Sequence, residues 1–195
     1  DNIVYAGERI QGFVQSLLGF ARPTSGVRPD LDLNRVIKDS LRLCQYDLAK
    51  VAVEVQVELA AELPLVSGIE AELQQVFINL FTNAAHASPA DGGLLRIVSE
   101  RDEKGVRVRV VDNGHGIPGD VLPRIFEAFY STKEEGKGSG LGLSIVKRII
   151  DQHSGRLTVE SEVGKGTTFQ IEIPQAAARP SADAPSRPKV GAGGS

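Results

Sequence analysis

Residues 136–146 read GKGSGLGLSIV, which places four glycines within seven positions directly before an apolar, helix-like pattern. A glycine inside a helix costs about 1 kcal/mol relative to alanine, so this clustering needs a reason. The spacing fits neither the P-loop, since Lys137 is followed by Gly138, nor the dinucleotide fingerprint G-x-G-x-x-G. A glycine loop that leads into a helix start offers free amides to an anion. The stretch therefore predicts either a phosphate-binding loop or a hinge that binds no ligand.

The segments on either side of this loop alternate between helical and strand patterns. Helical spacing of apolar residues predicts helices at 33–49, 70–87 and 140–153. Strict alternation predicts strands at 51–59, 94–101, 106–112, 156–162 and 167–173, the first of them half-buried. A polar, glycine-rich loop joins 113 to 138. This order predicts an α/β (α+β) two-layer sandwich, in which a mixed, mostly antiparallel sheet carries helices on one face and follows a bundle-type α-helix.

The two ends of the chain differ from this central domain, which we place at 31–174. Residues 1–22 form a predicted helix whose apolar positions alternate at spacings of three and four, a pattern typical of a helical pair or bundle. Packing against its own domain is the alternative for this helix. Residues 23–30 contain two prolines and a glycine and predict a linker. Residues 175–195 are rich in Ala, Pro, Ser and Gly and are expected to be disordered.

The composition is that of a globular protein, with 41% hydrophobic and 24% charged residues. A net charge of −3 gives no support for binding to nucleic acid. The single cysteine, Cys44, excludes an internal disulfide and a cysteine-based zinc site. The chain contains no methionine and begins with Asp1, so we expect a fragment or a processed product. No apolar run is long enough to span a membrane, and we expect a cytoplasmic domain of a parent protein that could itself be membrane-anchored.

Three polar residues of the predicted helix 70–87 share one of its faces. Asn79, Asn83 and His86 stand at i, i+4 and i+7, next to the apolar stripe of the helix. A carboxamide oxygen is a suitable ligand for a hard cation, and the other groups would then lie near phosphates. A solvated helix face with one hydrogen-bonded histidine explains the same pattern.

Two predicted strands carry polar residues on their buried faces. Asp112 continues the inward face of the strand 106–112, and a carboxylate at the edge of a core needs hydrogen-bond donors, such as the amino group of a purine. Gly114 and Gly116 leave room for a flat ligand just beyond it. Thr167 points inward from the strand 167–173, so its hydroxyl can join Asp112 around one ligand. The alternatives are a tight Asp-Asn-Gly turn and an ordinary threonine at a strand entry.

Taken together, these segments resemble the catalytic domain of bacterial sensor histidine kinases, a fold shared with gyrase B, MutL and the heat-shock chaperone ATPases. The resemblance covers about 31–174 and rests on five segments, which are QQVFINLFTNAAHA at 74–87 (the N box), DNGHGIP at 112–118 (the first glycine box), RIFEAFYSTK at 124–133 (the F box), GKGSGLGLSIV at 136–146 (the second glycine box) and GKGTTFQIEIP at 164–174 (the closing strand). Residues 1–22, which end in LLGFARP, resemble the second helix of the family's dimerisation and phosphoacceptor module.

The resemblance implies ATP and Mg²⁺ as ligands and a role for each matching position. Asn83 would be the metal ligand, and Asp112 would accept from the adenine amino group, with Gly116 against the ring. His86 holds a place where the family often has another polar or basic residue. Phe126, Phe129 and Tyr130 would anchor a mobile lid. The residues implied in catalysis are Asn79, Asn83, His86 and Lys133. The residues implied in nucleotide binding are Asn83, His86, Asp112, Gly114, Gly116, Ile117, Tyr130, Thr132, Lys133, Gly138, Gly140, Leu141, Gly142, Leu143 and Thr167.

The same fold serves kinases and hydrolases, and one position separates them. In the ATPase branches of the family a glutamate four residues before the metal-binding asparagine activates water, whereas this chain has Asn79 there. A carboxamide is a poor general base, which favours phosphoryl transfer to a protein. The three histidines, His86, His115 and His153, all lie in or beside the nucleotide-binding segments, and none lies in the first helix.

We therefore expect a protein-histidine kinase fragment that binds ATP but does not phosphorylate itself. The acceptor would be a histidine on a dimerisation helix, upstream or in trans, and the phosphoryl group would pass to an aspartate of a response-regulator receiver domain. The parent protein would be a homodimer. The alternatives are a GHKL-type ATPase, a serine kinase of the anti-sigma type, which the bundle-like helix 1–22 disfavours, and a non-catalytic nucleotide-sensing module.

Overall fold

The computed structural model describes residues 28–132 and 140–177. The predicted helix 1–22, the linker up to residue 27 and most of the predicted disordered tail lie outside these residues. In chain order the elements are β1 (Asp30–Leu31), α2 (Leu33–Lys50), β2 (Glu54–Leu59), β3 (Val66–Ser67), α3 (Glu70–Ala87), β4 (Leu94–Asp102), β5 (Gly105–Asp112), the 3₁₀ turn η1 (Leu122–Arg124), α4 (Gly142–Gln152), β6 (Arg156–Glu162) and β7 (Gly166–Pro174).

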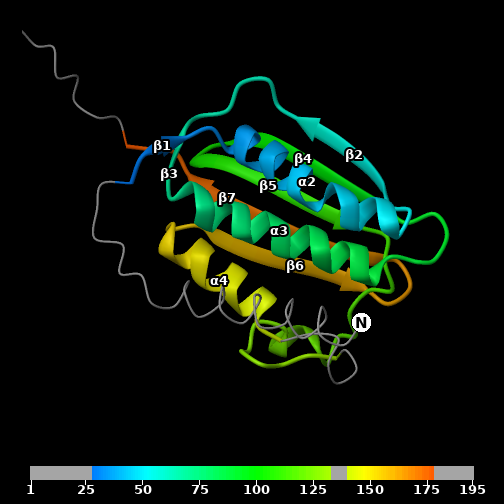
Figure 1. Ribbon diagram of the computed structural model, residues 1–195. Helices are drawn as coiled ribbons and strands as arrows, with labels where there is room; N and C mark the ends of the chain where they lie inside the picture. Colours follow the sequence, from blue (N-terminus) through cyan, green and yellow to red (C-terminus); the bar gives the residue numbers. More distant parts are fainter. Residues whose placement is uncertain (1–27, 133–139, 178–195) are drawn as a thin grey trace, which may run out of the picture.

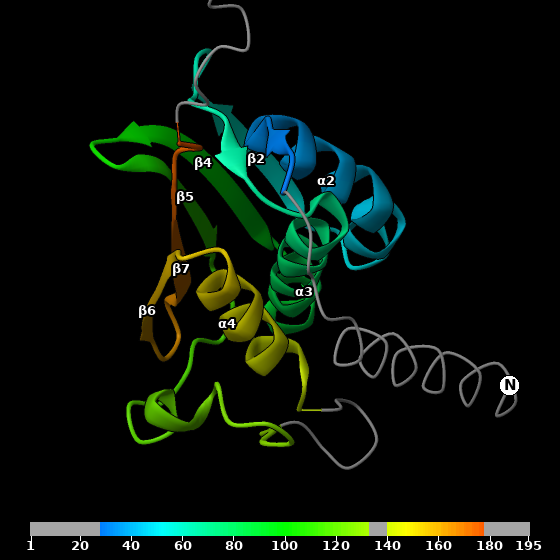
Figure 2. The ribbon, with the colours of Figure 1, turned by 90° about the vertical axis from the view of Figure 1, so that its left-hand side faces the viewer.

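Five strands form one mixed sheet in the order β2-β4-β5-β7-β6. β2 is parallel to β4, and the other neighbours are antiparallel. α2, α3 and α4 all lie on one face of this sheet (Figure 1), and the view from the side shows the two layers, with no described helix on the opposite face (Figure 2). The predicted two-layer sandwich is confirmed. None of the described helices is both long and apolar enough to cross a lipid bilayer.

The helices form where the sequence supplies a cap or an apolar stripe. Asp32 caps α2, because its carboxylate accepts from the backbone N–H groups of Asn34 and Arg35. α3 has no side-chain cap of this kind, and its stability comes from burial. Its inward stripe includes Phe77 and Phe81, whose rings stack with centroids 6.0 Å apart in a mostly aliphatic core. This stripe fixes which face of α3 stays open to solvent.

The strand predicted at 51–59 is shorter and more exposed than expected. The chain turns at Ala52, which has a φ of 52°, and the strand begins only at Glu54. β2 is an edge strand, and Val55 and Val57 keep 36% and 44% of their surface exposed. The prediction of half-burial was therefore wrong, because alternation in sequence does not say whether a neighbouring element covers the strand. β1 and β3 were not predicted, since two residues are too few to show a period.

Candidate functional site

A cavity of about 300 Å³ opens between α3, the end of β5, the beginning of β7 and the beginning of α4. The segment that follows β5 supplies the remaining wall. Twelve of the predicted site residues line it, namely Asn79, Asn83, His86, Asp112, Gly116, Ile117, Tyr130, Thr132, Gly140, Gly142, Leu143 and Thr167. Gly114 and Leu141 lie beside these residues in the chain but do not line the cavity. Lys133 and Gly138 lie outside the described residues.

Asp112 is a buried carboxylate with one oxygen left for a ligand. Its Oδ1 accepts from the backbone N–H groups of Gly114, at 2.9 Å, and Thr167, at 3.2 Å. Within the described part of the chain, its Oδ2 has no hydrogen-bond partner, although the residue lines the cavity and is only 8% exposed. Burial raises the pKa of this carboxyl above its ordinary value, and the two N–H donors act in the opposite direction. Such a group is satisfied by a ligand that donates a hydrogen bond.

A second network of hydrogen bonds, centred on Ser161, holds the residues around Asp112. Thr167 is the register partner of Asp112 on β7, and the contact between them is made by the Thr167 backbone. The Thr167 hydroxyl lies 2.9 Å from Ser161 Oγ, which also accepts from the Ile117 N–H at 2.8 Å. Sequence reasoning missed Ser161, and the signal that could have found it is its pairing with Thr167 in a β6–β7 hairpin.

Two of the predicted glycines are required by close backbone contacts. Gly116 has a φ of +71°, and a Cβ there would lie 2.1 Å from the carbonyl oxygen of Glu162. Gly140 has a φ of +66°, and its Cβ would lie 2.5 Å from the carbonyl carbon of Phe129. A Cβ on Gly116 would therefore meet the end of β6, while Gly116 itself lines the cavity, and its place against a flat ligand stays a prediction. Both glycines allow loops to pack tightly at the rim of the cavity.

The two asparagines of α3 have different surroundings. Asn79 accepts from Gln75 Nε2 at 3.2 Å, and its own amide donates to the Gly142 carbonyl at 3.3 Å, at the beginning of α4. Asn83 is half-buried and lines the cavity, and His86 lies on its exposed rim. Among the described residues, no group of three or more His, Cys, Asp or Glu side chains could hold a metal ion. A cation at Asn83 would therefore need most of its oxygen ligands from phosphates and water.

The segment between Ile117 and Thr132 anchors one wall. Phe126 packs against the core, and Tyr130 lines the cavity with the Arg124 guanidinium 4.1 Å from its ring centroid. Phe129 is 72% exposed, and its expected role as a lid anchor stays a prediction. Its backbone has a φ of 68° and donates to the Gly140 carbonyl at 2.9 Å. Phe129 thus contributes to this wall through its backbone and not through its ring.

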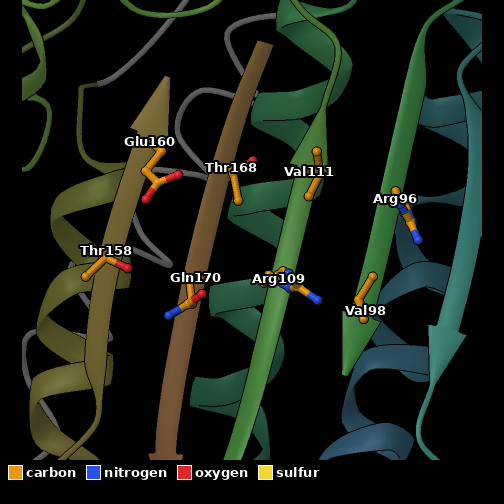
Figure 3. A pocket seen from close by; sticks show the side chains of 8 residues that line it. All are labelled: Arg96, Val98, Arg109, Val111, Thr158, Glu160, Thr168 and Gln170. Atoms are coloured by element: carbon orange, nitrogen blue, oxygen red, sulfur yellow. The ribbon is translucent and has the colours of Figure 1, made fainter. Parts of the chain in front are cut away.

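A second hollow, of about 320 Å³, lies on the face of the sheet opposite α2, α3 and α4 (Figure 3). Its lining comes from β4, β5, β7 and β6 and consists of Arg96, Val98, Arg109, Val111, Thr158, Glu160, Thr168 and Gln170. Arg96 is already held by Glu58 through two bonds of 2.9 Å. The two hollows have similar volumes, so volume alone does not show which of them binds a ligand. The first contains the buried carboxylate with an open oxygen and the predicted residues, so we assign the ligand site there.

Comparisons with known proteins identify the family. The family described as "Histidine kinase-, DNA gyrase B-, and HSP90-like ATPase" matches residues 68–177, more than half of the chain. Sensor kinase CckA of Brucella abortus (strain 2308) is 39% identical over a 189-residue alignment that covers 89% of this chain and 20% of that protein. Sensor histidine kinase ZraS of Escherichia coli (strain K12) is 34% identical over 167 residues, 86% of this chain and 35% of that protein. The chain thus spans about a fifth to a third of these curated relatives.

Solved structures agree with this fold. The nucleotide-free catalytic domain of histidine kinase ThkA superposes with a TM-score of 0.67 at 34% identity, over 75% of this chain and 97% of that one. The mycobacterial sensor histidine kinase MprB gives a TM-score of 0.66 at 30% identity, over 76% and 97%. Full-length ShkA in complex with AMPPNP gives 0.75 at 28% identity, over 89% and 38%. With its mixed sheet, its cavity and these matches, the chain belongs to the histidine kinase-, DNA gyrase B- and HSP90-like ATPases and carries the catalytic domain of a sensor histidine kinase.

Proposed function

We propose that this domain binds ATP with Mg²⁺ and transfers the γ-phosphoryl group to a histidine on a dimerisation helix that lies upstream or in another chain. The observation that carries the proposal is the open Oδ2 of Asp112 in a cavity that also faces a helix start. A buried acceptor suits the amino group of adenine, and the beginning of α4 suits an anion, because unpaired backbone amides and the positive end of the helix dipole meet there.

Each side chain then has a specific task. Asp112 accepts from the adenine amino group, with Thr167 and Ser161 holding the surrounding backbone. The amides of Gly142 and Leu143 face the phosphates at the beginning of α4. Asn83 would supply one oxygen to Mg²⁺, which would help to neutralise the charge that develops on the transferred group. In the transfer, an imidazole nitrogen attacks the γ-phosphorus, the bond to the bridging oxygen breaks, ADP leaves and the ring proton passes to solvent.

The surroundings of Asn79 support transfer to a protein over hydrolysis. Its carboxamide is engaged by Gln75 on one side and by the Gly142 carbonyl on the other, and it has no useful basicity near neutral pH. His86 on the rim and Lys133 would lie near the phosphates. A GHKL-type ATPase would need another group to activate water. A nucleotide-sensing module remains the second alternative, since binding alone requires none of these catalytic roles.

We also propose the domain organisation and the partners of the parent protein. Residues 1–22 would form the second helix of a dimerisation module, 23–30 a linker, 31–174 the catalytic domain and 175–195 a disordered tail. The matches to ShkA and to the relatives extend over 86–89% of the chain, which supports a segment shared beyond the catalytic domain. ThkA has been crystallised with the response regulator protein TrrA, and its match covers 89% of this chain at 28% identity. By analogy, a receiver-domain aspartate would be the final acceptor, and the parent would be a homodimer.

Labelled ATP tests the proposal directly. The chain is incubated with [γ-³²P]ATP and Mg²⁺, alone and with a separate helix hairpin that carries an acceptor histidine. We expect label on the hairpin and not on the chain. Label on His86, His115 or His153 would contradict the absence of an internal acceptor, and rapid phosphate release without the hairpin would identify an ATPase. Calorimetry with Mg²⁺ and a non-hydrolysable ATP analogue separates a sensing module, which binds without turnover, from a chain that does not bind.

A further inference from the structure

His153 is a completely buried imidazole that the proposed chemistry does not use. It follows α4 directly and lies at the C-terminal cap of that helix. Its Nδ1 is 2.8 Å from the Ile149 carbonyl oxygen, and its Nε2 is 3.1 Å from the Ile69 amide nitrogen. Because a backbone N–H can only donate, Nε2 must accept, and the ring proton must lie on Nδ1. The histidine is therefore a neutral bridge between two helices, and burial, which lowers its pKa, keeps it neutral.

The N–H that His153 accepts belongs to the N-terminus of α3. Ile69 is the N-cap residue of α3 and provides no side-chain hydrogen bond there, so the imidazole serves one of the donors that a helix start leaves open. The fit is tight, since a Cβ on Gly68 would lie 2.8 Å from His153 Cδ2. Glu72 on α3 has its Oε2 4.0 Å from Nε2, and this oxygen is buried without a hydrogen bond among the described residues.

A second bond joins the middle of α3 to the beginning of α4. The Asn79 amide donates to the Gly142 carbonyl where α4 begins, so α3 and α4 run antiparallel. Ten residues separate Ile69 from Asn79 on α3, and eleven separate Gly142 from His153 on α4. At a rise of 1.5 Å per residue these spans are about 15 Å and about 16.5 Å. The two bonds therefore sit at matching separations and oppose both sliding and tilting of α4 against α3.

We propose that His153 is a positioning residue for nucleotide binding. Together with Asn79 it fixes α4 along α3, and so fixes the helix start at Gly142 relative to Asn83 on the opposite wall of the cavity. Neither His153 nor Ile69 touches the cavity, so the effect on the ligand is transmitted through the two rigid helices. The inference rests on the proposed function, because it concerns the phosphate end of that site.

The test uses two variants of His153 whose amide side chains, glutamine and asparagine, differ in length by one methylene. In His153→Gln the amide oxygen can reach the Ile69 N–H, whereas in His153→Asn the amide can serve the Ile149 carbonyl but is too short for Ile69. Asparagine is also tolerated at helix ends, so both variants should fold. By calorimetry with Mg²⁺ and a non-hydrolysable ATP analogue, we expect His153→Asn to bind about tenfold more weakly, which equals ~1.4 kcal/mol, and His153→Gln to bind nearly as tightly as the unchanged chain. Equal affinity for both variants would overturn the proposal.

Two further measurements separate positioning from general stability. Ile150→Val shortens a fully buried neighbour on α4 and should lower the melting temperature without changing nucleotide affinity. If its affinity falls in parallel with that of His153→Asn, the effect is one of stability and the proposal fails. Nitrogen NMR of the labelled histidines in the unchanged chain should show the Nδ1–H tautomer at His153, and an Nε2–H tautomer would exclude the bond to Ile69. If the unchanged chain binds no nucleotide, the proposed function fails, while the tautomer still reports on the bridge.

Discussion

The substitution Asp112→Asn separates the structure of the cavity from its recognition of the base. An asparagine keeps an oxygen where Oδ1 accepts from Gly114 and Thr167, so the backbone around it can stay in place. It replaces Oδ2 with an NH₂ group, which cannot accept from the adenine amino group and instead presents a donor to it. We therefore expect a folded domain that presents a hydrogen-bond donor to the ligand where the unchanged chain presents an acceptor.

The size of the effect follows from the bond that is lost. A hydrogen bond to a charged group contributes about 1.5–3 kcal/mol, so the affinity for the ATP analogue should fall about tenfold to about 150-fold at 1.4 kcal/mol per decade. The free energy of unfolding of the variant, in contrast, should not decrease. Burial raises the folded-state pKa of Asp112, so the free energy of unfolding of the unchanged chain decreases as the pH rises through that pKa. Asparagine does not titrate, so the variant should be at least as stable at pH 7.

Calorimetry at pH 7 and thermal unfolding at pH 7 and near pH 3.5 measure both effects. The stability advantage of the variant should shrink at the lower pH, where Asp112 is mostly protonated in both the folded and the unfolded states. A variant that binds the nucleotide within threefold of the unchanged chain would refute the assignment of Oδ2 as the base acceptor. A variant that loses its cooperative thermal transition would show that the carboxylate is needed for folding, against the argument from Oδ1.

Three further predictions concern separate parts of the domain. Gly116→Ala should lower the free energy of unfolding by about 1–3 kcal/mol in urea titrations, because its φ is +71° and its Cβ would meet the Glu162 carbonyl; an unchanged midpoint would contradict the close approach. Asn83→Ala should reduce nucleotide affinity in Mg²⁺ to the level measured in EDTA, and an undiminished Mg²⁺ effect would exclude Asn83 as a ligand. Burial raises the pKa of Cys44, so iodoacetamide at pH 8 should modify it far more slowly in the native than in the urea-unfolded chain, and equal rates would contradict its burial.

The parts of the fold that could be predicted from sequence are those where a local period meets a single buried face. The alternation of Val106, Val108 and Val110 placed Asp112 on the inner face of β5, and the structure buries these three valines and Asp112. The bounds of α3 were predicted at 70–87, as the structure has them, because its apolar stripe is regular and ends at a polar segment. In each case the information lies within one element.

The features that were missed depend on partners far along the chain. The exposure of β2 follows from its place at the edge of the sheet, which the alternation of Val55 and Val57 does not encode. Ser161 accepts from the backbone N–H of Ile117, which lies 44 residues earlier in the chain. The bond between His153 and Ile69 joins positions 84 residues apart, and no local pattern marks either partner for the other.

The walls of the cavity come from positions as distant as Asn79 and Phe169. On a ribosome, the pocket cannot form until β7 has emerged from the exit tunnel and has paired with β5, because Thr167 completes it. A ligand stabilises only the states that can bind it. Cellular ATP can therefore stabilise the finished domain but not its nascent intermediates. A polypeptide released before Gly166 would not bind the nucleotide.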